Sequence, residues 1–243
     1  MCPNRITDQR YLGSDYAESN PTWDIEDSPW KARQVLRMLN AHGLKPRRVV
    51  DVGCGAGGVL AGLRDALPDA ALHGYDIAPD AAHLWPALKE TGIRFRSGDF
   101  LQSGDGNYDL MLLLDVIEHV ANPFEFLSGL RGRADHYLFH IPLDLSAVSV
   151  LREAPLLHVR NKVGHIHYFT KTLALMLLDE CGYQVRDWFY TGASLTGPAR
   201  GWKTRLARLP RRVAYAINKD AGVRLLGGET MIVLAQTDRA GQS

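Results

Sequence analysis

The chain is organised around residues 49–58, which read VVDVGCGAGG. An apolar run rich in β-branched residues stops in a cluster of glycines, and an amphipathic pattern follows over residues 59–67. This change of period predicts a strand, a tight turn and a helix. Glycine permits the unusual backbone angles of such a turn, and the free N–H groups at the helix start favour an anionic or electron-rich ligand group. The stretch therefore predicts an α/β fold with a nucleotide-like site.

The glycine spacing differs in part from that of dinucleotide-binding enzymes. Gly53, Gly55 and Gly57 alternate with other residues, whereas dinucleotide enzymes show G-x-G-x-x-G, a spacing that Gly58 also supplies here. Asp51 lies two residues before the first glycine, where a dinucleotide-binding strand is usually apolar. An NAD-type oxidoreductase is therefore kept as an alternative.

The charge balance argues against a nucleic-acid partner. The 243 residues carry 28 Lys and Arg against 27 Asp and Glu, which gives a formal net charge of +1. We expect a cytoplasmic protein, because the N-terminal residues lack the apolar core of a signal peptide and the three cysteines show no metal-ligand pairing.

Apolar patterns along the chain predict seven strands and several helices, and the continuous apolar run that ends at Asp115 predicts a buried parallel strand. A helix is expected from Ser28, as N-cap, and Pro29 to about Gly43. A further helix is expected over the site within residues 143–162, and Thr170 is expected to cap a late helix. The expected strands are 48–52, 71–76, 93–96, 108–115, 136–142, 183–191 and 229–235.

Four motifs together resemble a known family. Residues 50–57 are similar to motif I of the class I S-adenosylmethionine (SAM)-dependent methyltransferases, and Asp76 follows Gly57 by the spacing of a ribose-binding acid. Residues 115–120 read DVIEHV, as in many small-molecule members including the ubiquinone-biosynthesis O-methyltransferases, and residues 164–170 resemble a G-H-x-x-x-F-T turn.

The resemblance covers about residues 49–235 and implies the fold and domain layout. The fold would be a Rossmann-like, mostly parallel seven-stranded sheet with the last strand antiparallel and helices on both faces. An N-terminal lid would occupy residues 1–43, the SAM-binding domain residues 44–237, and a tail residues 238–243. Insertions are expected at about 143–163 and 192–228.

The same resemblance implies residues for the cofactor, SAM. For Asp76 and Asp99 a local structural role is the alternative, as a helix cap or a turn residue. The predicted cofactor-binding residues are Asp51, Gly53, Cys54, Gly55, Gly57, Asp76, Ile77, Asp99, Phe100 and Asp115.

The sequence also offers candidate residues for binding the methyl acceptor and for taking its proton. Trp23, Trp30 and His167 are candidates for contact with a small-molecule substrate, although Trp30 would equally serve to pack its helix on the sheet. Because histidine is the usual general base near neutral pH, the candidate bases are His165 first, then His140 and His119.

A metal site is a further alternative. Asp115, Glu118 and His119 correspond to the acid-x-x-Glu-His group that is associated with a divalent metal in the ubiquinone-type enzymes, so that Mg²⁺ is an optional second cofactor. Hydrogen bonding at the cofactor edge is the favoured role of these residues.

The expected activity is methyl transfer to a small molecule, with the hydroxyl oxygen of a metabolite, sugar or lipid-like intermediate favoured. A carrier- or lipid-linked acceptor fits the basic, amphipathic segment 200–212, which would make peripheral contact with a membrane at most. A non-catalytic SAM-binding partner protein is the second alternative.

Overall fold

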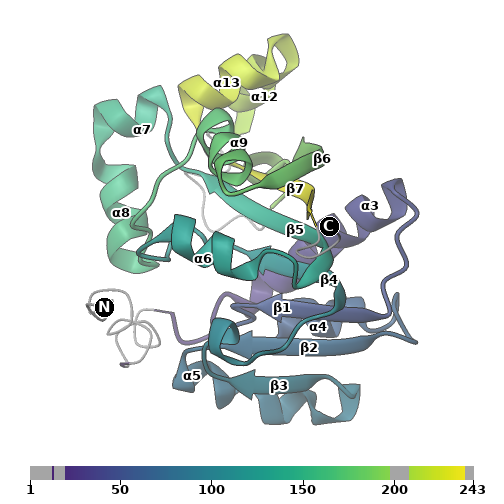
Figure 1. The fold of residues 1–243 in the computed structure, drawn as a ribbon. Coiled ribbons are helices and arrows are strands. Elements are labelled where there is room, and N and C mark those ends of the chain that lie inside the picture. The colour runs from purple at the N-terminus through teal and green to yellow at the C-terminus, as the bar shows by residue number, and fades with distance from the viewer. Residues whose placement is uncertain (1–12, 14–19, 198–207, 239–243) are drawn as a thin grey trace.

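The computed structural model describes residues 13, 20–197 and 208–238. Its centre is a seven-stranded sheet of strand order β3-β2-β1-β4-β5-β7-β6 (Figure 1). Strand β7 runs antiparallel to both of its neighbours, β5 and β6, and the other pairs are parallel. The predicted fold class is confirmed. The strands are β1 (Arg48–Val52), β2 (Ala71–Asp76), β3 (Arg94–Ser97), β4 (Tyr108–Leu114), β5 (Ala134–Leu143), β6 (Tyr183–Tyr190) and β7 (Glu229–Thr237).

Side-chain alternation along the strands builds two cores, one on each face of the sheet. On β4, Met111 and Leu113 join the core beneath α6 and α9, whereas Leu110 and Leu112 join the core beneath α3 and α4. Because both faces are covered, β4 is apolar from Leu110 to Leu114 instead of alternating with polar residues. The covering helices are α3 (Ser28–Ala41), α4 (Gly58–Leu63), α6 (Pro123–Leu130) and α9 (Lys171–Glu180).

Several expected boundaries differ from the structure by one or more residues. Helix α3 contains Ser28 as its first residue, and its N-cap is Asp27, so the N-cap prediction is off by one. Helix α4 ends at Leu63, four residues before the expected end, and the Arg64 guanidinium then donates to the carbonyls of the following turn. The N-cap at Thr170 is confirmed, because its hydroxyl oxygen accepts from the Leu173 N–H at 3.3 Å.

The first insertion holds two helices in place of the single one expected. Helices α7 (Ala147–Arg152) and α8 (Ala154–Lys162) meet at Glu153, whose φ is +54°. Pro155 lies directly after this break. Because proline lacks an N–H and clashes with a preceding helical turn, it prevents α7 from continuing as one helix.

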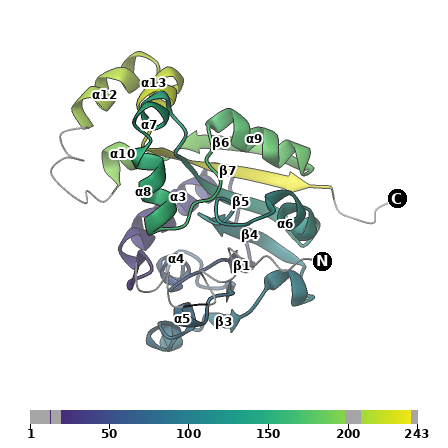
Figure 2. The same ribbon diagram turned by 90° about the vertical axis from the view of Figure 1, so that its left-hand side faces the viewer.

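The second insertion holds α10 (Ala193–Thr196), α12 (Arg208–Ile217) and α13 (Lys219–Leu226). Pro210 does not break α12, because it lies in the first turn, where a missing N–H leaves no intrahelical bond unmade. Residues 200–207 of the predicted basic segment lie outside the described residues. Figures 1 and 2 place α12, α13 and α7 together at one end of the molecule.

Short helices complete the fold between β2 and β4 and before α3. They are η1 (Ile25–Asp27), α5 (Pro79–Ala82), η2 (Trp85–Thr91) and η3 (Phe100–Gln102). No helix among the described residues is both long and apolar enough to span a bilayer. The loops that follow β1, β2, β3, β4 and β5 emerge from one edge of the parallel part of the sheet, and this edge carries the candidate site.

Candidate active site

The glycine turn between β1 and α4 has the backbone that its sequence demands. Gly53, Gly55 and Gly57 have φ values of +82°, +50° and +78°. Other residues rarely adopt such angles, so the glycines are required by the turn itself. The N–H groups of Gly53 and Cys54 both donate to the Tyr75 carbonyl, which joins the turn to the end of β2.

Asp76, at the end of β2, faces this turn. Its two carboxylate oxygens accept hydrogen bonds from the N–H groups of Gly55, at 2.8 Å, and Ala78, at 2.9 Å. Ala78, not Asp76, is the N-cap of α5. The carboxylate therefore lies beside the glycine backbone, as the ribose-binding prediction requires, and it also stabilises the local turn.

The two residues predicted to contact the adenine ring have local partners. Asp99 caps η3 by accepting from the Leu101 N–H at 2.8 Å. Phe100 is buried and packs edge-on against Tyr75. Ile77, by contrast, is 38% exposed beside the glycine turn.

Asp51 is a buried acid on β1 with little compensation. Its side chain is 2% exposed, and Oδ1 has no hydrogen-bond partner among the described residues. Burial raises the pKa of Asp51 to about 7, against the attraction of Lys31 and together with the repulsion of Asp76. Cys54 is also buried, and burial raises the pKa of its thiol well above the usual value, which fits a small packing residue rather than a reactive thiolate.

The two predicted lid tryptophans differ in their surroundings. The Trp23 ring lies over the glycine turn, 3.5 Å from where a Cβ on Gly55 would stand. Trp30 is buried on α3 and meets the His140 ring edge-on, with ring centres 5.9 Å apart. Trp23 therefore lies against the glycine turn, whereas Trp30 is buried between α3 and His140, and their contact with a substrate stays a prediction.

Asp115, directly after β4, joins α3 to β5. Its carboxylate pairs with Lys31 Nζ at 2.6 Å and with His140 Nδ1 at 2.6 Å. Burial opposes ionisation of Asp115, but His140 and Lys31 outweigh it and lower the pKa of the carboxyl. Asp115 has a φ of +58°, so its backbone is held in a conformation that non-glycine residues rarely adopt.

His140 is held at both ring nitrogens. Nδ1 contacts Asp115, and Nε2 lies 2.8 Å from the Thr230 hydroxyl on β7. Neither nitrogen is left for an exchange of protons with a substrate, so the geometry assigns His140 to the internal network.

The segment after α8 is hydrogen-bonded to the loop after β4 through main-chain groups. The N–H groups of Ile166 and His167 donate to the Glu118 carbonyl at 2.9 and 3.1 Å. The His167 ring contacts the Val120 carbonyl through Nε2 at 2.9 Å, so this nitrogen already has a partner within the protein. These contacts place His165 beside Glu118 and His119.

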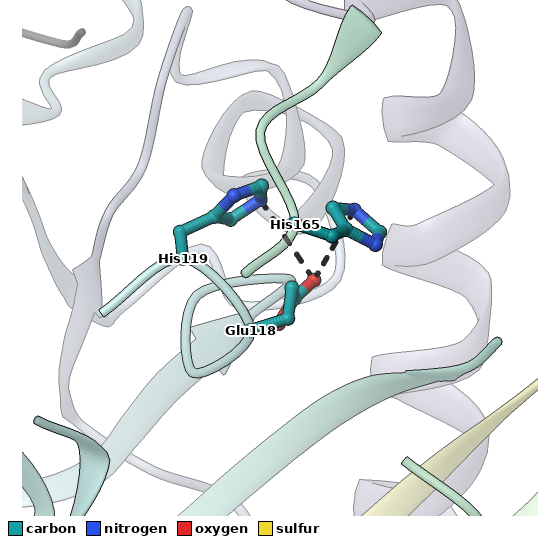
Figure 3. Close-up of side chains that lie close together, drawn as sticks. All are labelled: Glu118, His119 and His165. Carbon is teal, nitrogen blue, oxygen red and sulfur yellow. Dashed lines mark ion pairs between the residues drawn. The ribbon is translucent and has the colours of Figure 1, made fainter. Parts of the chain in front are cut away.

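His165 and His119 face Glu118 (Figure 3). His165 Nδ1 lies 2.6 Å from the Asp144 carboxylate, and its Nε2 lies 4.0 Å from Glu118 Oε1, beyond hydrogen-bond distance. His119 Nε2 lies 3.9 Å from the same oxygen, and burial together with the proximity of His165 lowers the pKa of His119 to about 3. The Glu118 side chain is completely buried, and neither of its carboxylate oxygens has a hydrogen-bond partner in the described part of the chain.

Glu118, His119 and His165 also form a group that could hold a cation. One ligand atom from each of Glu118, His119 and His165 lies within 4.8 Å of the others. Two imidazoles and one carboxylate suit a divalent transition metal, and the orphaned Glu118 oxygens agree with such a role. Asp115, which the sequence grouped with Glu118 and His119, is instead engaged by Lys31 and His140.

Comparison with known proteins decides the family. The methyltransferase domain family matches residues 28–187, more than half of the chain. The trans-aconitate 2-methyltransferase of Mycobacterium sp. (strain KMS) is 30% identical over 211 residues, which cover 79% of this chain and 82% of that relative. The chain belongs to the class I SAM-dependent methyltransferases.

One further relative agrees with this assignment, and one solved structure shares the fold. The ubiquinone biosynthesis O-methyltransferase of Aliivibrio fischeri (strain MJ11) is 26% identical over 68% of this chain and 78% of its own length. The crystal structure of magnesium protoporphyrin IX methyltransferase from Synechocystis PCC 6803, with bound SAH, shares the fold at a TM-score of 0.57 and 19% identity. That similarity covers 86% of this chain and 83% of the other chain.

Membership of this methyltransferase family confirms the resemblance and the SAM cofactor, and it removes the oxidoreductase alternative. The individual site roles stay predictions. Sequence reasoning did not single out Asp144 or Thr230, and it did not foresee the pairing of Lys31 with Asp115. Asp144 carries a signal in retrospect, because it is an acid directly after the strand that ends at Leu143.

Proposed function

We propose that this methyltransferase methylates a hydroxyl oxygen of a small molecule and that His165 accepts the hydroxyl proton. The observation that carries the proposal is the Asp144–His165 pair. Asp144 binds Nδ1 at 2.6 Å, so the ring is oriented and its Nδ1 carries the proton. Nε2 is then the basic nitrogen, and it has no hydrogen-bond partner within the described ranges.

The other two histidines support this choice by contrast. His140 uses both ring nitrogens within the Asp115–Thr230 network. The pKa of His119 is lowered to about 3, so its ring has little affinity for a proton at neutral pH. Of the three candidate histidines, His165 is the one whose surroundings suit proton transfer.

In the proposed reaction the acceptor oxygen attacks the methyl carbon in line with the carbon–sulfur bond. The carbon–oxygen bond forms as the carbon–sulfur bond breaks, S-adenosylhomocysteine (SAH) leaves, and the hydroxyl proton passes to His165 Nε2. Because the sulfonium is already a strong methyl donor, alignment supplies most of the rate and the base completes the step.

The relatives are named for small-molecule chemistry and do not fix the acceptor group: one is a trans-aconitate methyltransferase, whose substrate offers carboxylates and no hydroxyl, and another is a ubiquinone biosynthesis O-methyltransferase. Metabolites, sugars and lipid-like or carrier-linked intermediates with a free hydroxyl are the acceptors to test. The near-neutral net charge argues against nucleic acid.

The test is a screen for SAH formation with matched hydroxyl and amine acceptors, followed by variants. His165→Ala is expected to lower kcat by roughly 10²–10⁴-fold, the usual contribution of a general base. Asp144→Asn is expected to lower kcat in the same direction, because it disturbs the tautomer, and both variants should bind SAH like the wild type. Turnover of amines alone, or a fully active His165→Ala protein, would overturn the proposal.

A further inference from the structure

Helix α12 presents an apolar face to solvent. Leu209, Val213 and Ile217 are spaced four residues apart and therefore share one face of the helix, where they are 67%, 57% and 82% exposed. The opposite face carries Tyr215, which is buried in the core. A helix packed only on its own domain would turn its apolar stripe inward, so this stripe is available to a partner.

Neighbouring helices extend this apolar surface. Twelve large apolar residues are exposed in the described part of the chain, and seven of them lie on α7, α8, α12 and α13. Helix α13, which carries the exposed Leu225, packs against both α12 and α7. The three helices α7, α12 and α13 lie together in both ribbon views (Figures 1 and 2).

The charges on α12 and α13 are mostly positive. Residues 208–226 contain five basic residues and a single acid, Asp220. That acid is already engaged, by Lys171 Nζ at 2.6 Å and by the Tyr190 hydroxyl at 2.6 Å. Arg212 and Arg224 are exposed, and Arg224 lines a shallow groove of about 480 Å³ between α7 and α13.

We propose that the α12–α13 surface, with its exposed stripe Leu209, Val213 and Ile217 and its exposed Arg212 and Arg224, docks this methyltransferase on an anionic phospholipid bilayer. An interfacial helix places its apolar side chains at the boundary of headgroups and acyl chains, while nearby cations pair with anionic lipid. The combination found here, an exposed apolar stripe flanked by arginine and free of uncompensated acid in α12 and α13, has that chemistry. The docking is independent of which acceptor is methylated.

The experiment is sedimentation of the full chain with vesicles of phosphatidylcholine, with and without phosphatidylglycerol. The wild type is expected to bind the anionic vesicles, less at high salt, and phosphatidylcholine vesicles weakly. The double variant Val213→Glu with Ile217→Glu should lose roughly tenfold or more in affinity, because two charges enter the acyl boundary. Arg212→Glu with Arg224→Glu should weaken binding and remove its dependence on phosphatidylglycerol.

A matched control places the same charge on exposed apolar positions of α6 and α9, as Phe124→Glu with Met176→Glu. This control should bind vesicles like the wild type. SAH binding and the circular dichroism spectrum should be unchanged in every variant, since all the altered side chains are exposed.

Three outcomes would overturn the docking proposal. The first is a wild-type protein that does not bind anionic vesicles, and the second is a Val213→Glu, Ile217→Glu variant that binds as well as the wild type. The third is a wild type that dimerises through this face, becomes monomeric in that variant and has no affinity for lipid, which would identify a second copy of the chain as the occupant.

Discussion

Replacing Asp51 with Asn should make the protein more stable at neutral and alkaline pH. Asp51 is buried on β1, with one carboxylate oxygen unpaired among the described residues. Asparagine has nearly the same shape and carries no charge, so it fills the same space without the cost of burying an ionised group. The variant thus isolates the electrostatic cost of Asp51.

The size of the effect follows from the pKa of Asp51, which is raised from 3.8 to about 7 by burial. Because the folded protein holds this proton more tightly than the unfolded chain, the stability of the wild type falls as pH rises through the window between these two values. A shift of about 3 pKa units corresponds to about 4 kcal/mol. The variant should therefore match the wild type below the window and exceed its free energy of unfolding by up to about 4 kcal/mol above it.

The assay is urea denaturation of both proteins at a series of pH values that brackets this window. Titrating groups far from Asp51 contribute equally to both proteins, so the difference in free energy of unfolding reports Asp51 together with its coupling to Lys31 and Asp76. The control is Asp69→Asn, which changes an exposed carboxyl and should give a small difference without a trend. A difference between Asp51→Asn and the wild type that stays constant with pH would refute the reasoning.

Three further predictions concern the glycine turn, the cofactor acid and the histidine cluster. Asp76→Ala should weaken SAH binding by roughly 10–100-fold in calorimetry, as expected for lost hydrogen bonds to a charged group, whereas Asp76→Asn keeps one acceptor oxygen and should lose less; unchanged affinity for the alanine variant would remove the ribose assignment. Gly57→Ala places a Cβ 2.5 Å from the Phe95 ring, at a residue whose φ is +78°, and should lower the free energy of unfolding by about 1–3 kcal/mol in thermal unfolding. Gly43→Ala should lower it less, because a Cβ there has no neighbour within 4 Å, although φ is +62°. Chelation by EDTA should leave turnover unchanged if His165 is the base; a loss that a divalent transition metal such as Mn²⁺ or Zn²⁺ restores would instead assign the cluster around Glu118 to a metal.

The sequence determined the parts of the protein that depend on local backbone geometry and on period. The strand–turn–helix at residues 49–58 was predictable because only glycine readily takes the positive φ angles found at Gly53, Gly55 and Gly57. The continuous apolar run of β4 predicted a strand covered on both faces, and Thr170 predicted a helix start, since a hydroxyl there satisfies a free N–H. The order of motifs was then enough to predict the family.

The partners of the histidines were decided by the tertiary structure. For two of them the partners come from distant segments: Asp144 for His165, and Asp115 with Thr230 for His140. The candidate metal ligands also differ from those expected. Lys31 on α3 pairs with Asp115, and His165 takes its place beside Glu118 and His119. Proton affinity and ligand geometry depend on distances of a few ångströms between side chains that the chain brings together only on folding, and no spacing along the sequence encodes those distances.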